Sequence, residues 1–175
     1  EFTTMESYQA YADYNDVMAM VEEMVSSIAR DALGTTRVKY ADQELELAPP
    51  WPRLDLRQAI KDKSGIDIDD YPDAASLWDR MRGLGVAVEG TPARGKLIDA
   101  LISNFVEPTL IQPAFLVDYP VDLSPLAKRK PGNDRYVERF EAFAAGMEIA
   151  NAFSELNDPL EQRQRFEQQL KDREI

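Results

Sequence analysis

Three carboxylates recur at seven-residue intervals in residues 139–158, RFEAFAAGMEIANAFSELND. Glu141, Glu148 and Glu155 stand among phenylalanine, isoleucine and alanine residues in a stretch that reads as strand-like. A carboxylate in apolar surroundings is costly unless a cation compensates its charge. We therefore expect this segment to bind a cation. One candidate is a hard divalent ion, which binds oxygen ligands and can complete its coordination with phosphate oxygens. The other is an amine, which a buried carboxylate holds through a charge-assisted hydrogen bond.

The composition excludes several other kinds of site. The chain has no cysteine and no histidine, so it offers no disulfide, no thiolate or imidazole zinc ligand, and no Ser-His or Cys-His catalytic pair. Its 32 acidic and 20 basic residues give a net charge of -12, which argues against this segment alone holding nucleic acid. The basic run at residues 128–130 is predicted to be a solvated loop, with a nucleic-acid contact as the alternative.

The length and hydropathy of the chain limit the classes of protein to which it can belong. A chain of 175 residues with 44% hydrophobic content suits one domain with an ordinary core. No apolar run approaches the roughly 20 residues that a bilayer span requires, and the N-terminus does not read as a signal peptide. We therefore expect no membrane partner and a cytoplasmic location.

The N-terminal part is predicted to hold a strand, a helix and a hairpin. Residues 1–11 carry strand-like aromatic residues. Apolar residues at helical spacing over residues 17–32 predict an amphipathic helix that ends at Gly34. Two short alternating segments, residues 37–40 and 44–47, predict a small hairpin.

A helical block follows. Three residues with N-capping side chains each precede a segment with a helical pattern. These are Asp55 before residues 56–63, Asp73 before residues 74–82, and Thr91 with Pro92 at the first helical position, opening a helix through about residue 105. We interpret residues 53–107 as a helical insertion.

The C-terminal part is predicted to return to the sheet. The expected strands span residues 110–119, 136–143 and 147–155. Residues 158–161 have the form of a capping box that opens a closing helix. Three apolar residues of that helix are expected to pack on the sheet: Leu160, Phe166 and Leu170. The predicted class is α+β, with an antiparallel sheet, flanking helices and a helical insertion dividing the chain into residues 1–52, 53–107 and 108–175.

Three separate segments resemble class II lysyl-tRNA synthetases, in that family's order and at compatible spacing. They are EFTTMESYQAYADYNDVM at residues 1–18, LIQPAFLVDYPVDLSPLAKRK at residues 110–130, and RFEAFAAGMEIANAFSELND at residues 139–158. The resemblance covers nearly the whole chain. It implies the antiparallel sheet of the class II synthetase core, in a fragment that starts within the family's second motif and stops before its third.

The resemblance implies a lysine pocket. Glu155 matches the glutamate that meets the ε-ammonium of lysine, Tyr8 the tyrosine that adds a hydroxyl to that ammonium, and Glu6 the glutamate that accepts from the α-amino group. Positions 6 and 8 would share one face of the predicted strand. Asn151 and Phe153 match the substrate-lining asparagine and phenylalanine.

The resemblance also implies a nucleotide and metal site. Glu141 and Glu148 match the pair that holds Mg²⁺ between the phosphates of ATP, and Phe2 matches the aromatic residue on which adenine stacks. Glu148 has the opposite strand parity to Asn151. We therefore predict a β-bulge between positions 148 and 151, which would turn both side chains to the same cleft.

The implied reaction has two steps. Lysine and ATP give lysyl-adenylate and pyrophosphate, and the 3′ end of tRNA(Lys) then takes the lysyl group. The family's motif arginines are expected outside this chain, so we expect no catalytic residue within it and no useful activity from it alone. The parent enzyme is expected to be a homodimer.

Three alternatives stay open from the sequence. A paralogue that lysylates a protein would share this core. An aspartyl or asparaginyl synthetase would share the fold, although its substrate needs a cation in the pocket where this chain has Glu155. The chain in isolation could also act as a binding module for lysine without catalysis.

Overall fold

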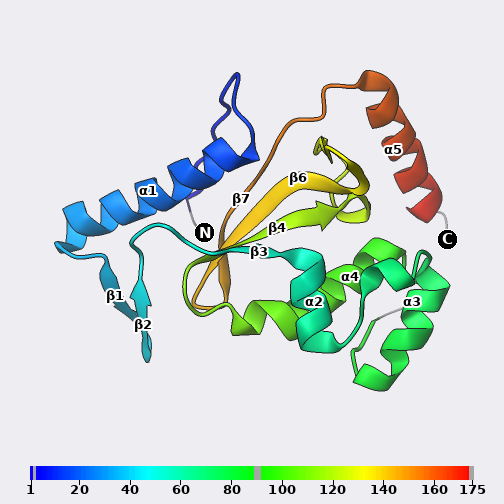
Figure 1. Ribbon diagram of the computed structural model, residues 1–175, viewed down its shortest axis with the longest axis horizontal. Coiled ribbons are helices and arrows are strands. Elements are labelled where there is room, and N and C mark those ends of the chain that lie inside the picture. Colours follow the sequence, from blue (N-terminus) through cyan, green and yellow to red (C-terminus); the bar gives the residue numbers. More distant parts are fainter. Residues whose placement is uncertain (2, 89–91, 174–175) are drawn as a thin grey trace.

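The computed structural model describes residues 1, 3–88 and 92–173, and its centre is a five-stranded sheet (Figure 1). The strand order is β3-β4-β6-β5, and β7 also pairs with β6. The strands are β3 (Arg53–Asp55), β4 (Ala114–Pro120), β5 (Arg129–Lys130), β6 (Asn133–Ala144) and β7 (Met147–Phe153). The β3–β4 pair is parallel, and the other pairs are antiparallel. The predicted α+β class with an antiparallel sheet is confirmed, with the addition of one short parallel strand.

Helices surround this sheet, and a separate hairpin extends from it. The α-helices are α1 (Tyr14–Leu33), α2 (Leu56–Ser64), α3 (Ala74–Met81), α4 (Arg94–Leu101) and α5 (Pro159–Arg173). Shorter helical turns are η1 (Ile68–Asp70), η2 (Arg82–Leu84), η3 (Ile102–Val106), η4 (Glu107–Thr109) and η5 (Val121–Leu123). The predicted hairpin is present as β1 (Arg37–Tyr40) and β2 (Gln43–Glu46). The predicted start of the third helix at Thr91 lies outside the described residues.

Helix α1 has clear start and stop signals. The side chain of Asp13 accepts hydrogen bonds from the backbone N–H groups of Asn15 and Asp16, and Asp16 accepts from the Asp13 N–H in return. This reciprocal capping satisfies backbone donors that a helix start leaves open. Gly34 ends the helix with φ of 74°, a left-handed conformation that glycine adopts without steric cost.

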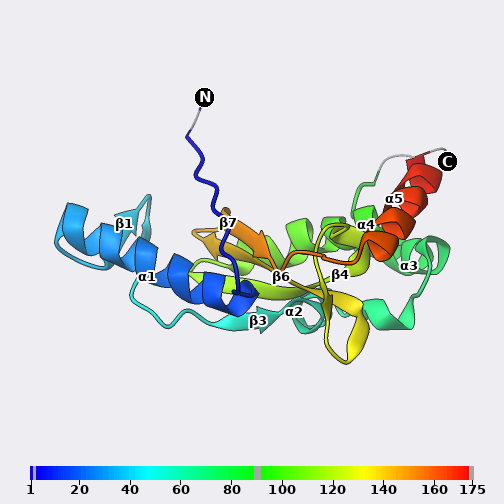
Figure 2. The ribbon, with the colours of Figure 1, turned by 90° about the horizontal axis from the view of Figure 1, so that it is seen from above.

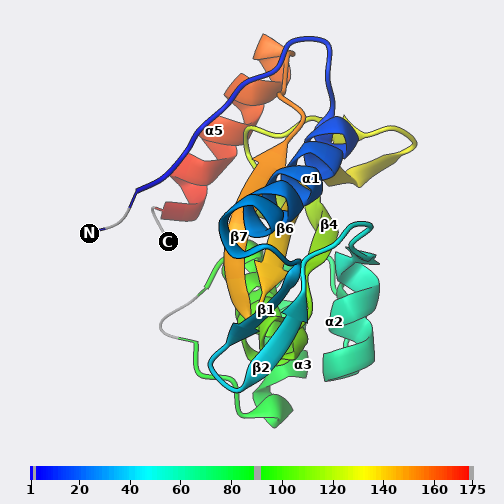
Figure 3. The same cartoon turned by 90° about the vertical axis from the view of Figure 1, so that its left-hand side faces the viewer.

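The two faces of the sheet are buried by different helices. Helix α1 lies over one face (Figure 3), where its Tyr14, Met18 and Val21 form an apolar cluster with sheet residues that include Phe115 and Phe140. On the other face, Leu116 and Phe143 belong to a cluster that includes buried residues of α2, α3 and α4. The helices between residues 56 and 109 therefore share one apolar core with the sheet. The division of the chain at residues 53 and 107 stays a prediction.

The predicted strand at residues 1–11 is wrong. Residues 3–9 have no regular secondary structure, and the segment leads away from the sheet (Figure 2). Tyr8 and Tyr11 are fully or almost fully exposed. Aromatic residues favour a strand only where a neighbouring strand pairs with the backbone and a core receives the rings. Here the segment lies apart from both.

The predicted packing of α5 is also wrong. Leu160, Phe166 and Leu170 are 72%, 43% and 59% exposed, whereas Arg165 is buried. Asp158 caps the helix as expected, because its side chain accepts from the N–H groups of Leu160 and Glu161. The side chain of Glu161 pairs with Arg129 and Arg165 instead of turning back to Asp158. Polar contacts therefore attach α5 to the rest of the chain, whereas the apolar pattern predicted a hydrophobic contact with the sheet.

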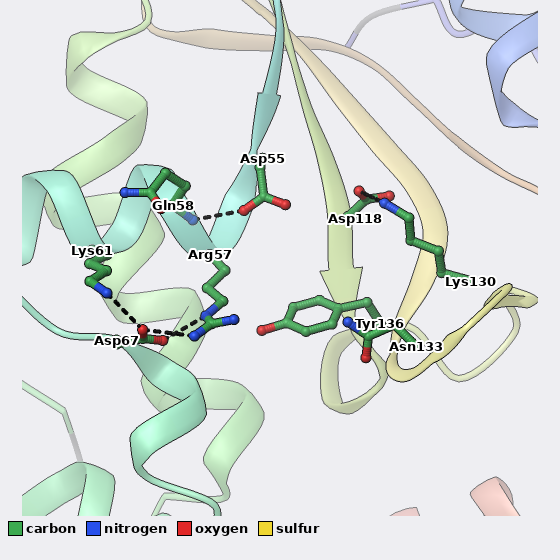
Figure 4. Close-up of a pocket in the computed structure, with 9 residues that line it drawn as sticks. All are labelled: Asp55, Arg57, Gln58, Lys61, Asp67, Asp118, Lys130, Asn133 and Tyr136. Carbon is green, nitrogen blue, oxygen red and sulfur yellow. Dashed lines mark hydrogen bonds and ion pairs between the residues drawn. The ribbon is translucent and has the colours of Figure 1, made fainter.

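An ion-pair cluster joins α2 to the turn that follows it. Arg57 donates two hydrogen bonds to Asp67, of 2.6 and 2.8 Å, and Lys61 donates a third of 3.0 Å. Arg57 also pairs with Asp69 at 2.7 Å, and the hydroxyl of Tyr136 on β6 donates to Asp69 at 2.8 Å. The cluster lines a cavity of about 480 Å³ between α2 and the β5–β6 hairpin (Figure 4). It connects the helical block to the sheet through polar bonds.

Replacing Asp67 with asparagine should lower the free energy of unfolding by about 1–3 kcal/mol at pH 7, because two cations would lose a buried anionic partner. The Arg57 hydrogen bonds hold the pKa of Asp67 well below its usual range. A lowered folded-state pKa stabilises the fold above the unfolded-state value of about 4, and this stabilisation is lost as the pH falls through the folded value. Urea unfolding at pH 7 and at progressively lower pH should show the two proteins converge.

Asp79→Asn is the matched control, since Asp79 forms an exposed pair with Arg82. We expect this variant to change stability by less than about 0.5 kcal/mol. Equal effects of the two substitutions would contradict a structural role for the Asp67 cluster.

Candidate functional site on the β6–β7 hairpin

The β6–β7 hairpin brings four of the predicted site residues onto one face: Glu141, Glu148, Asn151 and Phe153. Cross-strand partners are Glu141 with Asn151, and Phe143 with Glu148. Between them the register shifts, because Ala142 pairs with Ala150 while Phe143 pairs with Glu148. Residue 149 is thus the extra residue of a β-bulge. The bulge predicted between positions 148 and 151 is confirmed, and it turns Glu148 to the face of Glu141 and Asn151.

Arg139 is the centre of the polar network on this face. Its guanidinium donates to the Glu141 carboxylate at 2.5 Å and to the Asn151 side-chain oxygen at 3.1 Å. It also donates to the Leu123 carbonyl at 2.8 Å and to the Ser124 hydroxyl oxygen at 2.9 Å. The side chains of Arg139 and Glu141 are only 15% and 13% exposed, so this ion pair is weakly screened by solvent. One cation therefore connects the sheet to the loop after η5.

Tyr119 completes the surroundings of Glu141. Its hydroxyl donates to the other Glu141 oxygen at 2.7 Å, and the Arg139 guanidinium lies 4.6 Å from the centre of its ring. Burial and the charge of Glu141 raise the pKa of Tyr119, so the phenol stays protonated as a donor. Both oxygens of Glu141 are thus engaged within the chain.

Glu148 and Glu107 add negative charge next to this network. Partial burial, followed by the charge of Glu141, raises the pKa of Glu148. Burial, with a smaller contribution from Glu141, raises the pKa of Glu107 on η4. The ionised carboxylates oppose one another, and a cation placed between them would relieve this repulsion.

Glu155 lies beyond the end of β7, on a segment fixed by backbone hydrogen bonds. It forms an antiparallel bridge with Ala127, and its side chain is exposed. Lys128 N donates to the Ser154 carbonyl at 2.8 Å, and Leu156 N donates to the Leu126 carbonyl at 2.9 Å. An exposed side chain thus stands on a backbone whose two neighbouring residues are hydrogen-bonded to residues 126 and 128. Such an exposed carboxylate can receive a ligand ammonium.

The structure separates the N-terminal candidates from this group. Glu6 and Tyr8 are exposed on the irregular segment, so the expectation that they share a strand face is wrong. Their role in lysine binding stays a prediction. The predicted adenine-stacking residue, Phe2, lies outside the described residues.

Arg139 and Tyr119 are the functional candidates that the sequence analysis missed. Arg139 has the same strand parity as Glu141, two residues away, and this spacing was the available signal. Tyr119 offered no comparable signal, because its contact with Glu141 depends on how β4 pairs with β6. For Arg139, the need to balance the charge of Glu141 and Glu148 was a further signal.

The donor set suits magnesium better than a metal that needs an all-protein cage. Mg²⁺ usually keeps several waters and is held by one or two carboxylates together with substrate phosphates. Among the described residues, no group of three or more carboxylates is placed to hold an ion. Glu141 and Glu148 offer two carboxylates on one face, and the raised pKa of Glu148 indicates that added positive charge would be favourable there.

The cavity between α2 and the β5–β6 hairpin is a different feature. Its lining includes none of residues 139–155. Asp67 on its wall pairs with Arg57 and Lys61, and Asp118 pairs with Lys130. These charges are already balanced within the chain, so we regard the cavity as part of the framework (Figure 4).

Comparisons with known proteins match the whole chain to one family. A family model described as tRNA synthetases class II (D, K and N) matches residues 1–175. The chain is 56% identical over 173 residues to a lysine-tRNA ligase of Dehalococcoides mccartyi (strain ATCC BAA-2266 / KCTC 15142 / 195). It is 54% identical over 173 residues to that of Moorella thermoacetica and 52% identical over 171 residues to that of Chloroflexus aurantiacus. These matches cover 98–99% of this chain and 35% of each relative, so the chain spans about a third of their length. No helix among the described residues is long and apolar enough to cross a membrane.

Replacing Glu148 with glutamine should stabilise the chain at neutral pH. The raised pKa means that ionised Glu148 is disfavoured in the folded state, so a neutral isostere removes this cost. The side chain is partly solvated, so the gain should be only about 0.2–1 kcal/mol. Thermal unfolding should show the gain at pH 7 and its loss below about pH 4, where the glutamate is protonated in both states.

Glu167→Gln serves as the control, because Glu167 lies exposed on α5 and pairs with Arg163. That variant should show no gain at any pH. A loss of stability for Glu148→Gln at pH 7 would mean that the folded chain already balances the charge of Glu148.

Proposed function

Because the chain belongs to the class II tRNA synthetases of the D, K and N group, we propose that it forms part of the catalytic core of a lysine-tRNA ligase. The parent enzyme would activate lysine with ATP to lysyl-adenylate and pyrophosphate. It would then transfer the lysyl group to the 3′ end of tRNA(Lys). The observation that carries this proposal is the 56% identity to a lysine-tRNA ligase over nearly the whole chain. The register of the β6–β7 hairpin, which puts Glu141 and Glu148 on one face of the sheet, supports it.

The proposed lysine pocket selects its substrate by charge. Glu155 would receive the ε-ammonium, and Asn151 and Phe153 would line the pocket beside it. A carboxylate that the bound substrate covers rejects an amino acid without a cationic side chain, because the carboxylate would then lose its contact with water and gain no partner. Glu6 and Tyr8 would join this pocket only if the N-terminal segment moves toward the sheet. Their exposed positions make this movement part of the proposal.

The proposed nucleotide site lies on the same sheet face. Glu141 and Glu148 would hold Mg²⁺, which would neutralise charge on the ATP phosphates. Arg139 would orient Glu141 through its 2.5 Å hydrogen bond, while Tyr119 holds the second oxygen of the same carboxylate. Catalysis of this kind depends on positioning and charge stabilisation, so a rigid first layer of side chains is what the chain would supply. Stacking of adenine on Phe2 remains part of the proposal.

The parent enzyme's surroundings also remain proposals. We expect tRNA(Lys) as the acceptor, a homodimer as the assembly and the cytoplasm as the location, all as implied by the family. The chain contains no residue to which we assign a chemical step, so the 175-residue chain alone should bind ligands without turnover.

Lysine-dependent ATP–pyrophosphate exchange on a full-length ligase that carries this chain tests the pocket. Glu155→Gln should lower kcat/KM for lysine by about 10- to 100-fold, since a charge-assisted hydrogen bond is replaced by a neutral one. Arginine and aspartate as competing substrates should support no exchange in the wild type. Glu167→Gln should behave as wild type. An unchanged kcat/KM for lysine in Glu155→Gln, or exchange that runs with aspartate, would overturn the assignment of the pocket.

Magnesium dependence tests the second site. Glu148→Gln should raise the Mg²⁺ concentration needed for half-maximal exchange by about tenfold or more, because one oxygen ligand of the ion loses its charge. The KM for lysine should stay close to that of the wild type, which separates this site from the amine pocket. Glu23→Gln on α1 is the matched control for a lost exposed carboxylate. An unchanged magnesium requirement would remove Glu148 from the metal site.

A further inference from the structure

Helix α5 is attached to the sheet through a buried arginine. Arg165 is 8% exposed, while the other described side chains of the helix are exposed or half-buried. Its guanidinium donates to the Ser124 carbonyl at 3.0 Å and to the Ala127 carbonyl at 2.7 Å. Glu161, one turn earlier, accepts from two of its nitrogens and balances its charge. The carbonyl acceptors lie in residues 124–127, hereafter the 124–127 loop.

The 124–127 loop holds the backbone around Glu155. The carbonyl of Leu126 accepts from Leu156 N at 2.9 Å, and Ala127 bridges to Glu155 itself. Directly after the loop, Lys128 N donates to the Ser154 carbonyl at 2.8 Å. These bonds lie on both sides of Glu155. The position of its backbone therefore follows the position of the loop.

We propose that Arg165 is a positioning residue for Glu155: it fixes the 124–127 loop, whose backbone in turn holds the carboxylate that selects lysine. This inference rests on the proposed lysine pocket. Arginine suits the task because its planar guanidinium carries five donors in a fixed arrangement, so one side chain can bind several carbonyls and a carboxylate together. A lysine in its place would keep the charge but would supply a single nitrogen.

The two ends of the loop have different supports. Arg139 on the sheet donates to the Leu123 carbonyl and to the Ser124 hydroxyl, at the start of the loop. Arg165 alone of these two arginines reaches Ala127, the residue that bridges to Glu155. Loss of Arg165 should therefore release the end of the loop beside Glu155 while Arg139 keeps Glu141 in place. The effect should fall on lysine binding and spare the nucleotide site.

The test compares Arg165→Lys and Arg165→Met with Arg163→Met in a full-length ligase that carries this chain. Arg163 lies two residues away on the exposed side of α5 and pairs with Glu167, which makes it a matched control. We expect both Arg165 variants to raise the KM for lysine about tenfold or more, because small displacements of a binding group are costly. The KM for ATP should stay unchanged, and the Arg163 variant should match the wild type.

Amide hydrogen exchange at residues 154–156 supplies a second readout. In Arg165→Lys these amides should exchange faster than in the wild type, while the amides of β6 keep their protection. A role in stability alone would lower the active fraction and leave both KM values unchanged, which would overturn the proposal. The lysine variant retains the charge beside Glu161, so it keeps the test possible if Arg165→Met does not fold.

Glu155→Gln measured in parallel distinguishes the two levels of inference. If it raises the KM for lysine while Arg165→Lys leaves the KM and the exchange rates unchanged, the pocket stands and the positioning role is wrong. If Glu155→Gln itself leaves the KM for lysine unchanged, the proposed pocket is wrong and the role of Arg165 falls with it.

Discussion

The rest of the structure depends on the pairing of β6 with three other strands. β6 bonds to β4 along one edge, and to β5 and β7 along the other. Its alternating side chains meet α1 on one face and the helical block on the other, so both apolar clusters include β6 residues. A strand in this position cannot shift by one residue without exchanging the two faces. Its register therefore decides which carboxylates lie on the same face as Leu116 and Phe143.

The two carboxylates on that face, Glu141 and Glu148, have different electrostatic surroundings. Glu141 has an arginine and a phenol as hydrogen-bond partners. The ionised form of Glu148 is disfavoured by partial burial and by the charge of Glu141. One carboxylate is thus oriented by the chain itself, and the other is held in a state that additional positive charge would improve. Functional sites commonly contain a charged group in an unfavourable environment, and the stability of the surrounding fold compensates for its free-energy cost.

Much of the fold could be predicted because local signals agreed with the tertiary structure. The stop of α1 at Gly34 and the caps of α2 at Asp55 and of α3 at Asp73 are local signals, and all three could be read directly from the sequence. The bulge near residue 149 could be predicted because two functional expectations conflicted in strand parity. By contrast, the outcome for residues 1–11 and for α5 depended on neighbours. Aromatic residues without a partner strand stayed exposed, and a polar contact at Arg165 replaced the apolar packing that spacing alone favoured.

The site was predictable in the same uneven way. Spacing singled out Glu141 and Glu148, and the family resemblance added Asn151; all three lie in one hairpin. Tyr119 approaches Glu141 only through the pairing of distant strands, so no local pattern could reveal it. The loop that fixes Glu155 comes from about thirty residues earlier in the chain, and its role follows from tertiary hydrogen bonds.

The bulge at Ile149 also changes the backbone along the free edge of β7. Among the described residues, β7 has a strand neighbour only on its β6 side, and Met147 and Ile149 are 44% and 42% exposed along it. An uninterrupted, flat edge with apolar side chains is a template onto which another chain can add a strand. The extra residue breaks the regular spacing of backbone donors and acceptors and increases the local twist. The same irregularity that turns Glu148 toward the site therefore makes this border a poor surface for aggregation.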